Sequence, residues 1–329
     1  MQLTHDPTDL STAHRLRRVV VTGAAGFIGS HLSRALLEAG TTVVGVDRRH
    51  PQRDPLAAAN LAELTSFPNF VPLTADLTTC ALDPVLLDAD AVFHLAAIPG
   101  VRPSWGPKFD SYVAANIQTV QRIMTAATRL HIRRVVLASS SSVYGATDGS
   151  PSRETDRPAP LSPYAVSKLA AEHLCLAHAA RPGTATEAIA LRYFTVYGPR
   201  QRPDMLIHRV LTATLGQTSL SIFGNGLQQR DFTYVDDAVR ATIAAAVAPV
   251  ASTVINVGAG SSNTITDVLN IAHQLTGRPV PALRSAAAAG DVPATLADIT
   301  QARDLLGWKP EVALIDGMDR QLRHLKESG

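Results

Sequence analysis

The sequence predicts an α/β fold in which a doubly wound parallel sheet is joined to a smaller C-terminal lobe. Apolar segments of strand length alternate with helical patterns through about the first 190 residues, and this alternation is typical of a parallel sheet with helices on both faces. A glycine-rich turn, TGAAGFIG at residues 22–29, joins the first apolar segment to a helical pattern, as in folds of the Rossmann type. Beyond residue 195, Gly and Pro separate shorter segments, which indicates a different, smaller unit.

The elements are expected in this chain order. Short apolar segments predict buried parallel strands at residues 19–21, 42–46, 70–73, 91–95, 134–138 and 188–192. Apolar residues at helical spacing predict long helices at 109–130 and 163–180. A helical segment at 236–248 and an apolar strand at 253–257 are expected to return to the sheet. We therefore expect a Rossmann-type domain at residues 15–194, joined by 229–262, and a substrate-binding lobe formed by residues 195–228 and 263–329.

The glycine-rich turn predicts a bound dinucleotide. Gly23 permits the tight turn, Gly26 lets the backbone approach a pyrophosphate, and Gly29 lets the helix pack against the strand. The free N–H groups at the start of the helix then face the phosphates. Asp47 ends the second strand, where a carboxylate accepts hydrogen bonds from ribose hydroxyls and repels a 2′-phosphate. This favours NAD over NADP, although the neighbouring Arg48 and Arg49 act in the opposite direction. The alternative is a tight strand–helix turn that binds nothing.

Composition excludes several classes of partner. The 329 residues carry a formal net charge of +2, with 46% apolar and 18% charged residues, which argues for a globular chain and against nucleic acid or a membrane surface as its partner. No apolar run approaches the length of a membrane-spanning helix. Cys80 and Cys175 lie far apart without metal-ligand spacing, so we expect reduced, buried thiols and a cytoplasmic protein. The histidines also lack ligand spacing, and no metal site is expected.

Two polar groups predict a reactive centre. Tyr164 and Lys168 are four residues apart in a predicted helix, which places both on one face. A lysine cation stabilises a phenolate, so we expect the pKa of Tyr164 to fall from about 10 toward neutrality and the phenol to act as a base on a substrate hydroxyl. The serine run at residues 139–142 ends a predicted strand, at the edge of the sheet where ligands bind. The alternatives are a surface Tyr–Lys pair and a serine-rich turn.

The chain resembles the extended short-chain dehydrogenase/reductase family, and within it the nucleotide-sugar epimerases and dehydratases. The motifs that carry this resemblance run in the expected order, roughly from residue 17 to residue 310: TGAAGFIG at 22–29, DL at 76–77, HLAA at 94–97, the serine run with VYG at 143–145, YAVSK at 164–168, RYFTVYGP at 192–199, RDFTYVDD at 230–237 and GDV at 290–292. The resemblance implies bound NAD and a sugar linked to UDP or dTDP. It also implies a homodimer, because relatives often pair through the equivalents of helices 109–130 and 163–180.

Residue by residue, the resemblance makes Tyr164 the catalytic base, Lys168 the anchor of the nicotinamide ribose, and Ser140 the catalytic hydroxyl. The implied cofactor-binding residues are Gly23, Gly26, Phe27, Ile28, Gly29, Asp47, Arg48, Asp76, Leu77, Leu95, Ala96, Ala97, Asn116, Tyr164 and Lys168. The implied substrate-binding residues are Arg102, Ser140, Ser141, Ser142, Tyr164, Thr195, Arg202, Arg230 and Asp291. One departure is Ala288, which stands where many relatives carry arginine, so diphosphate binding is expected to rely on groups such as Arg102 and Arg202.

The same resemblance narrows the sugar chemistry. In 4,6-dehydratases of the family, Asp-Glu follows the catalytic hydroxyl, whereas Ser141 and Ser142 supply no group that titrates near neutral pH. The segments HLAAIPGVR (94–102) and FTVYGPRQRPDM (194–205) look like UDP-glucuronate 4-epimerases. The expected reaction is 4-epimerisation of UDP-glucuronate to UDP-galacturonate through a transient 4-keto sugar, with Ser141, Ser142 and Thr195 around the C5 carboxylate. The alternatives are a UDP-glucose/galactose 4-epimerase, a UDP-glucuronate decarboxylase and, more remotely, a non-catalytic NAD-binding regulator.

Overall fold

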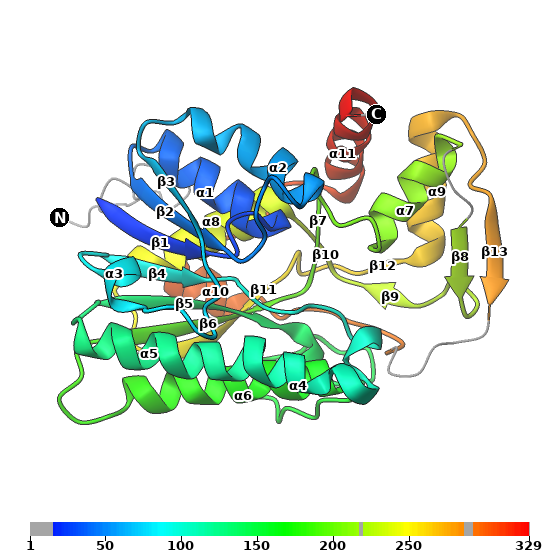
Figure 1. Ribbon diagram of the computed structural model, residues 1–329. Coiled ribbons are helices and arrows are strands. Elements are labelled where there is room, and N and C mark those ends of the chain that lie inside the picture. Colours follow the sequence, from blue (N-terminus) through cyan, green and yellow to red (C-terminus); the bar gives the residue numbers. More distant parts are fainter. Residues whose placement is uncertain (1–15, 217–219, 286–291, 329) are drawn as a thin grey trace, which may run out of the picture.

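A sheet of seven parallel strands forms the centre of the computed structural model, which describes residues 16–216, 220–285 and 292–328 (Figure 1). Asp291, expected in the substrate site, and Ala288 lie outside the described residues. The strand order is β11-β6-β5-β4-β1-β2-β3. The strands are β1 (Arg18–Thr22), β2 (Thr42–Asp47), β3 (Phe70–Thr74), β4 (Ala91–His94), β5 (Arg134–Ser140), β6 (Glu187–Tyr193) and β11 (Thr253–Val257). The predicted doubly wound sheet is confirmed, and segment 253–257 pairs with β6 as expected.

The strand order explains both the apolar sequence and the place of the site. Side chains of successive residues in β1 enter different clusters, Val19 and Val21 one core and Val20 the other, so the strand is apolar throughout. The chain proceeds from β1 outward to β2 and β3, and then returns to β4 on the other side of β1. Ligands of such sheets bind where this reversal occurs, beyond the carboxyl ends of the strands.

Helices cover both faces of the sheet (Figure 1). On one face α1 (Phe27–Glu38) packs against α8 (Val235–Val247), and on the other α5 (Thr119–Arg129) packs against α6 (Pro163–Ala179). Shorter helices, α2 (Pro55–Ala62) and α3 (Asp83–Leu86), lie between strands of the first half. The predicted helix 109–130 is continuous but not uniform, because α4 (Phe109–Tyr112) leads into a π-helical turn at Val113–Gln118 before α5. That wide turn carries Asn116.

The smaller lobe stands beside the carboxyl ends of the strands (Figure 1). It contains α7 (Leu206–Thr214), α9 (Ile265–Thr276) and the parallel pair of β8 (Leu220–Phe223) and β13 (Ala282–Ser285). Two short pairs connect it to the sheet domain: β7 (Thr195–Tyr197) with β10 (Phe232–Tyr234), and β9 (Gln229–Arg230) with β12 (Asn263–Thr264). The C-terminal helix α11 (Leu314–Ser328) contacts α7 and α9, whereas α10 (Thr300–Leu306) packs against β11 and α8. In the described part of the chain, no helix is long and apolar enough to cross a membrane.

Candidate active site

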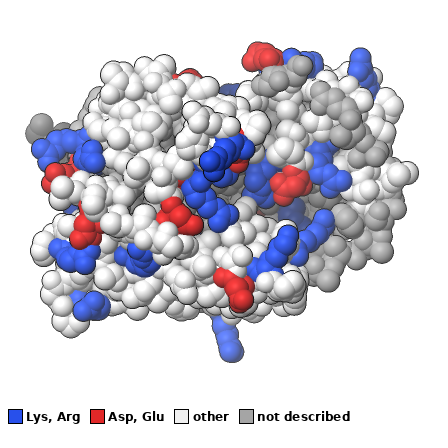
Figure 2. All heavy atoms as spheres, in the orientation of Figure 1, with Lys and Arg blue, Asp and Glu red and all other residues white. Residues whose placement is uncertain are grey.

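A cavity of about 680 Å³ opens beyond the carboxyl ends of the strands and extends under the smaller lobe. Its lining includes the glycine-rich turn, the serine run, both reactive residues of α6, and residues of segment 193–205. Basic side chains gather around the middle of the face shown in Figure 2, and the arginines that line the cavity are Arg48, Arg49, Arg200, Arg202 and Arg230. One cavity therefore combines the predicted cofactor and substrate sites in a basic environment suited to phosphates.

The glycine-rich turn has the shape of a pyrophosphate cradle. Gly23 has φ of +73°, and a Cβ at that position would lie 2.9 Å from the backbone nitrogen of Ala96. A Cβ on Gly29 would lie 2.1 Å from the carbonyl oxygen of Gly23, so no larger residue lets α1 approach this turn. Helix α1 begins after Gly26 with no side-chain cap, which leaves N–H groups at its N-terminus for an anion. These residues fit the pyrophosphate of a dinucleotide.

Asp47 is held rigidly at the end of β2. Its carboxylate accepts hydrogen bonds from the backbone nitrogens of Ala25 at 3.2 Å and Arg49 at 3.0 Å. The Arg49 guanidinium also donates to both carboxylate oxygens at 3.2 Å. Asp76, at the same end of the cavity, accepts from the backbone and the hydroxyl of Thr78, and these bonds lower the pKa of that carboxyl. This end of the cavity thus presents two carboxylates, which suit the hydroxyls of an adenosine ribose.

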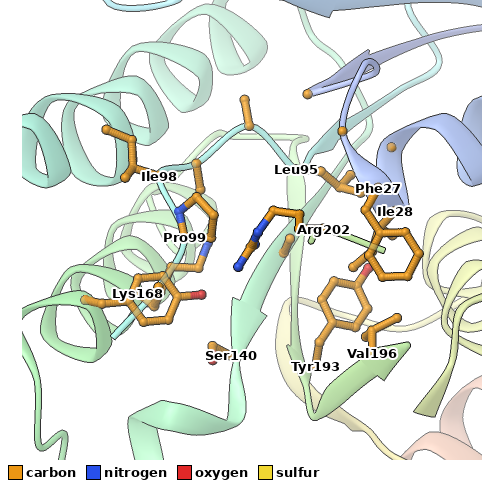
Figure 3. Close-up of a pocket in the computed structure, with 18 of the residues that line it drawn as sticks. Phe27, Ile28, Leu95, Ile98, Pro99, Ser140, Lys168, Tyr193, Val196 and Arg202 are labelled. Atoms are coloured by element: carbon orange, nitrogen blue, oxygen red, sulfur yellow. The ribbon is translucent and has the colours of Figure 1, made fainter. Parts of the chain in front are cut away.

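Helix α6 positions the predicted base. The Ser162 hydroxyl caps the helix by accepting from the backbone nitrogen of Ala165 at 3.1 Å, and Pro163 occupies the first helical position. The helix therefore starts at a fixed place, and Tyr164 and Lys168 both line the cavity. Figure 3 shows Lys168 and Ser140 on the same side of this pocket, with the Arg202 guanidinium reaching toward its middle.

The expectation that Lys168 lowers the pKa of Tyr164 is wrong for the structure as it stands. Burial raises the pKa of the Tyr164 phenol, because the low-polarity surroundings disfavour the phenolate. A hydrogen bond from Ser140 and the charge of Arg202 act in the opposite direction. Burial also lowers the pKa of Lys168 to about 8, and the nearby Glu172 carboxylate opposes this fall. Proximity on one helix face did not reveal that Lys168 is buried or that protein atoms surround the Tyr164 phenol.

The serine run forms a chain of hydrogen bonds that ends at the base. Ser140 Oγ accepts from the backbone nitrogen of Ser142 at 3.2 Å and from Ser142 Oγ at 2.9 Å. With both lone pairs engaged, the Ser140 hydroxyl proton remains for Tyr164 or for a substrate oxygen. Ser141 and Thr195 line the same cavity. The hydroxyls expected around a sugar carboxylate therefore do surround one space.

The segment after β7 is fixed to the cofactor helix. Arg200 has φ of +63° and donates from Nη2 to Glu63 Oε2 at 2.6 Å. The preceding carbonyl, that of Pro199, accepts from His31 Nε2 of α1 at 2.9 Å, and burial lowers the pKa of this imidazole to about 4. Arg202 follows, with both carboxylate oxygens of Asp204 at 2.9 and 3.1 Å from its guanidinium. The loop that brings arginines to the cavity is thus tied to α1.

Most of the predicted site residues line the cavity, and among the described ones Arg102 and Asn116 do not. The predicted residues that lie on its wall are Gly23, Gly26, Phe27, Ile28, Gly29, Asp47, Arg48, Asp76, Leu77, Leu95, Ala96, Ala97, Ser140, Ser141, Ser142, Tyr164, Lys168, Thr195, Arg202 and Arg230. Arg102 is exposed in a short 3-10 helix beside the cavity-lining Val101. Asn116 is buried and uses its amide to hold both backbone groups of Ile98 and the hydroxyl of Ser167. Asp291 lies outside the described residues.

Sequence reasoning missed other residues of the wall. Asn60, Thr119, Arg200 and Thr295 also line the cavity. Asn60 donates to the backbone carbonyl of Ala25 and so supports the glycine-rich turn. The signal for Arg200 was its place in the GPR triplet directly after β7. Among the described residues, no cluster of three or more His, Cys, Asp and Glu side chains is arranged to hold a metal ion.

Comparison with known proteins agrees with this geometry. The sequence profile of the NAD dependent epimerase/dehydratase family matches residues 19–258. Over 311 residues the chain is 41% identical to the uncharacterized UDP-glucose epimerase YtcB of Bacillus subtilis, covering 94% of this chain and 98% of that one. It is 35% identical to the UDP-glucuronate 4-epimerase of Thermodesulfobacterium geofontis, with 94% and 96% covered. The UDP-glucuronic acid 4-epimerase of Bacillus cereus, solved with UDP-glucuronic acid and NAD, superposes with a TM-score of 0.89 at 40% identity, covering 95% of this chain and all of that one.

Proposed function

Because the chain belongs to the NAD-dependent epimerase/dehydratase family, we propose that it interconverts UDP-glucuronate and UDP-galacturonate by 4-epimerisation. The observation that carries this proposal is the convergence of Tyr164, Ser140 and the hydroxyls of Ser141, Ser142 and Thr195 on the cavity that also contains the dinucleotide turn. Relatives solved with both NAD and UDP-glucuronic acid support the choice of substrate.

The residues of the cavity have distinct parts in this reaction. Ser140 holds the 4-oxygen of the sugar while Tyr164, as phenolate, takes the hydroxyl proton. NAD, when bound, accepts the hydride from C4 and returns it to the other face of the resulting ketone. Lys168, one helical turn from Tyr164 on the cavity wall, would hold the nicotinamide ribose. The Ser140 hydrogen bond and the charge of Arg202 favour the phenolate that burial otherwise disfavours. Because the cofactor ends each cycle oxidised, no external electron acceptor is consumed.

The hydroxyl cluster has a second part. A ketone at C4 turns the C5 carboxylate into a β-keto acid, which loses carbon dioxide when the C5–carboxylate bond aligns with the carbonyl π system. Ser141 and Thr195 offer neutral donors that hold the carboxylate away from that alignment, and they lie beside Ser142, whose own hydroxyl donates to Ser140. Arg202 and Arg230 line the same cavity and suit the diphosphate, where a planar guanidinium binds two oxygens at once. This arrangement favours epimerisation over decarboxylation.

The deciding experiment is a substrate screen on purified protein without added cofactor. UDP-glucuronate and UDP-glucose are incubated separately, and the products are resolved by chromatography and mass. We expect UDP-galacturonate from the first and little conversion of the second. Conversion of UDP-glucose alone would assign a UDP-glucose/galactose 4-epimerase, and a UDP-pentose as the main product would assign a decarboxylase. No conversion of any sugar nucleotide by NAD-loaded protein would favour a non-catalytic regulator.

The proposal also covers the cellular compartment and the oligomeric state. We propose a cytoplasmic homodimer whose relatives pair through the helices that correspond to α5 and α6. Both cysteines, the partly buried Cys80 and the buried Cys175, are free thiols, which is consistent with a reducing compartment. Light scattering during size-exclusion chromatography measures the mass directly, and a species of about 35 kDa instead of twice that mass would contradict the dimer.

A further inference from the structure

A buried ion pair lies directly behind the reactive residues. Arg192 on β6 donates from Nη2 to Glu172 Oε2 at 2.9 Å and from Nε to Glu172 Oε1 at 3.1 Å. Their side chains are only 4% and 2% exposed. The hydroxyl of Ser139, the register partner of Arg192 in the neighbouring strand, donates to the same carboxylate. One carboxylate thus joins α6 to the carboxyl ends of β5 and β6.

The position of Glu172 links it to both halves of the reactive centre. On α6 it lies one helical turn beyond Lys168, which itself lies one turn beyond Tyr164. Its second partner, Ser139, immediately precedes Ser140. Neither Glu172 nor Arg192 lines the cavity, so the pair acts on bound ligands only through the residues that it holds.

The pair also supports the back of the serine run. The Arg192 guanidinium lies over the ring of Tyr144, 4.7 Å from its centroid. The Tyr144 hydroxyl donates to Asn256 Oδ1 of β11 at 2.7 Å, and the Asn256 amide donates to the carbonyl of Ser152 at 2.8 Å. Tyr144 ends the 3-10 helix that begins with Ser141. A change in the pair is therefore transmitted to the hydroxyls of the cavity.

The charges around Lys168 come from several elements. On its own helix it faces Glu172, Cys175 and, one turn earlier, Tyr164. On β4 it faces His94, whose imidazole is fully buried. Beyond Glu172 lies the Arg192 cation of β6. Glu172 is the anion among these groups, and it favours the protonated lysine against the cost of burial.

We propose that Glu172 and Arg192 are positioning residues of this active site: their ion pair fixes the serine run against α6, and the Glu172 carboxylate keeps Lys168 protonated. This inference rests on the proposed function only for the choice of substrate in the activity assay. The effect of Glu172 on the protonation of Lys168 does not depend on which sugar is bound.

The same two strands contain a matched control. At their amino ends Arg134 pairs with Glu187 at 2.8 Å, in register, with Arg134 1% exposed. That pair lies at the opposite edge of the sheet from the cavity. Glu172→Gln and Glu187→Gln each remove one carboxylate that pairs with an arginine of these strands, the first on α6 near the site and the second on β6 far from it.

The first measurement follows Lys168 itself. The chain has four lysines, Lys108, Lys168, Lys309 and Lys326, so ε-13C-lysine NMR gives a spectrum of four signals, and Lys168→Arg identifies the signal of interest. We expect Glu172→Gln to lower the pKa of Lys168 by about one unit, the usual size of an effect from one nearby charge, and Glu187→Gln to leave it unchanged. An unchanged titration in both variants, or an equal shift in both, overturns the proposal.

The second measurement is the pH profile of turnover. In Glu172→Gln we expect kcat to fall about tenfold and its alkaline limb to move to lower pH, since Lys168 loses its proton earlier, with little change in KM. If this variant fails to fold because Arg192 is left as an unpaired buried charge, Glu172→Gln/Arg192→Met removes both charges and restores packing. A double variant with wild-type kcat and pH profile contradicts the inference. If the wild-type protein converts a sugar nucleotide other than UDP-glucuronate, the proposed function fails, while the lysine titration still decides this inference.

Discussion

At the amino ends of β5 and β6 the ion pair of Arg134 with Glu187 is open to water on one side, whereas at the carboxyl ends the pair of Arg192 with Glu172 is closed. Glu187 is 38% exposed and Glu172 only 2%. Arg134 also donates to the carbonyls of Ala248 and Val250, and so fastens the chain that follows α8. The two ion pairs have the same chemistry but different access to water. The pair that solvent screens joins segments of the chain, whereas the pair shielded from solvent also affects the ionisation of neighbouring groups.

The largest effect is expected where chemistry occurs, at the carboxyl end. Tyr164→Phe removes the proton acceptor but keeps the ring, so kcat is expected to fall by about 10³-fold, while NAD retention and unfolding by urea remain near wild type. The assay is epimerisation of UDP-glucuronate with the retained cofactor measured on the same sample. Undiminished turnover would remove Tyr164 from the mechanism.

The next effect compares the two arginines directly. Arg192→Met leaves Glu172 as a buried, unpaired charge and is expected to lower the free energy of unfolding by about 3–5 kcal/mol. Arg134→Met leaves the half-exposed Glu187 carboxylate and the carbonyls of Ala248 and Val250 without their arginine partner. This variant is expected to lower the free energy of unfolding by about 1–2 kcal/mol. Urea unfolding of both variants gives the difference. Equal losses would show that the two ends of the strand pair are not distinguished by their access to water.

A smaller effect concerns the fate of the keto sugar. Thr195→Ala removes one hydroxyl from the predicted carboxylate clamp, so release of carbon dioxide and of a UDP-pentose product is expected to rise about tenfold relative to epimer, a change of about 1.4 kcal/mol in the two barriers. In this side reaction the bond from C5 to the carboxylate breaks and its electrons form the enolate of the 4-keto pentose. Thr125→Ala, on the exposed face of α5, is the control. An unchanged product ratio would count against the clamp.

The last effect is a dependence of stability on pH, which is small near neutral pH and grows as the pH falls. The fully buried His94 at the end of β4 shares a hydrogen bond between its Nδ1 and the Thr22 hydroxyl, 2.7 Å away, and burial lowers its pKa to about 3. The unfolded chain therefore binds a proton below about pH 6.5 that the folded chain does not. The stability that depends on neutral His94 is complete above that pH and is lost as the pH falls toward 3, at about 1.4 kcal/mol per pH unit.

Urea unfolding at pH 7, 6 and 5 tests this dependence. His94→Asn is expected to reduce the loss of stability per pH unit by about the same 1.4 kcal/mol. His131→Asn, at an exposed position just before the amino end of β5, is expected to follow the wild-type curve. A wild-type slope in His94→Asn would mean that the imidazole stays accessible to protons in the folded chain.

The sequence predicted the parts of the molecule that depend on local pattern. The strands of the sheet and the glycine-rich turn follow from apolar runs and glycine spacing, and the structure confirms them. Tyr164 and Lys168 follow from a four-residue interval on one helix. Glu172 lies a further four residues along the same helix face. This spacing was the sequence feature that pointed to a carboxylate near Lys168.

Features that depend on distant segments were not predictable in this way. The partner of Glu172 is Arg192, twenty residues away on another element. The π-helical turn that takes Asn116 away from the cavity follows from tertiary contacts with Ile98 and Ser167. The pKa of Tyr164 depends on how completely the packed helix is buried, which neighbouring residues in sequence do not reveal.

The hydrogen bonds that His31 and Glu63 make to the loop at residues 198–205 affect how substrate specificity can change in such proteins. Since His31 holds the carbonyl of Pro199 and Glu63 holds Arg200, the loop at residues 198–205 cannot be exchanged alone for that of a paralogue with another sugar preference. A functional loop graft must therefore also include the residues at positions 31 and 63. We expect substitutions that change sugar specificity in the loop to be accompanied by substitutions at these two positions.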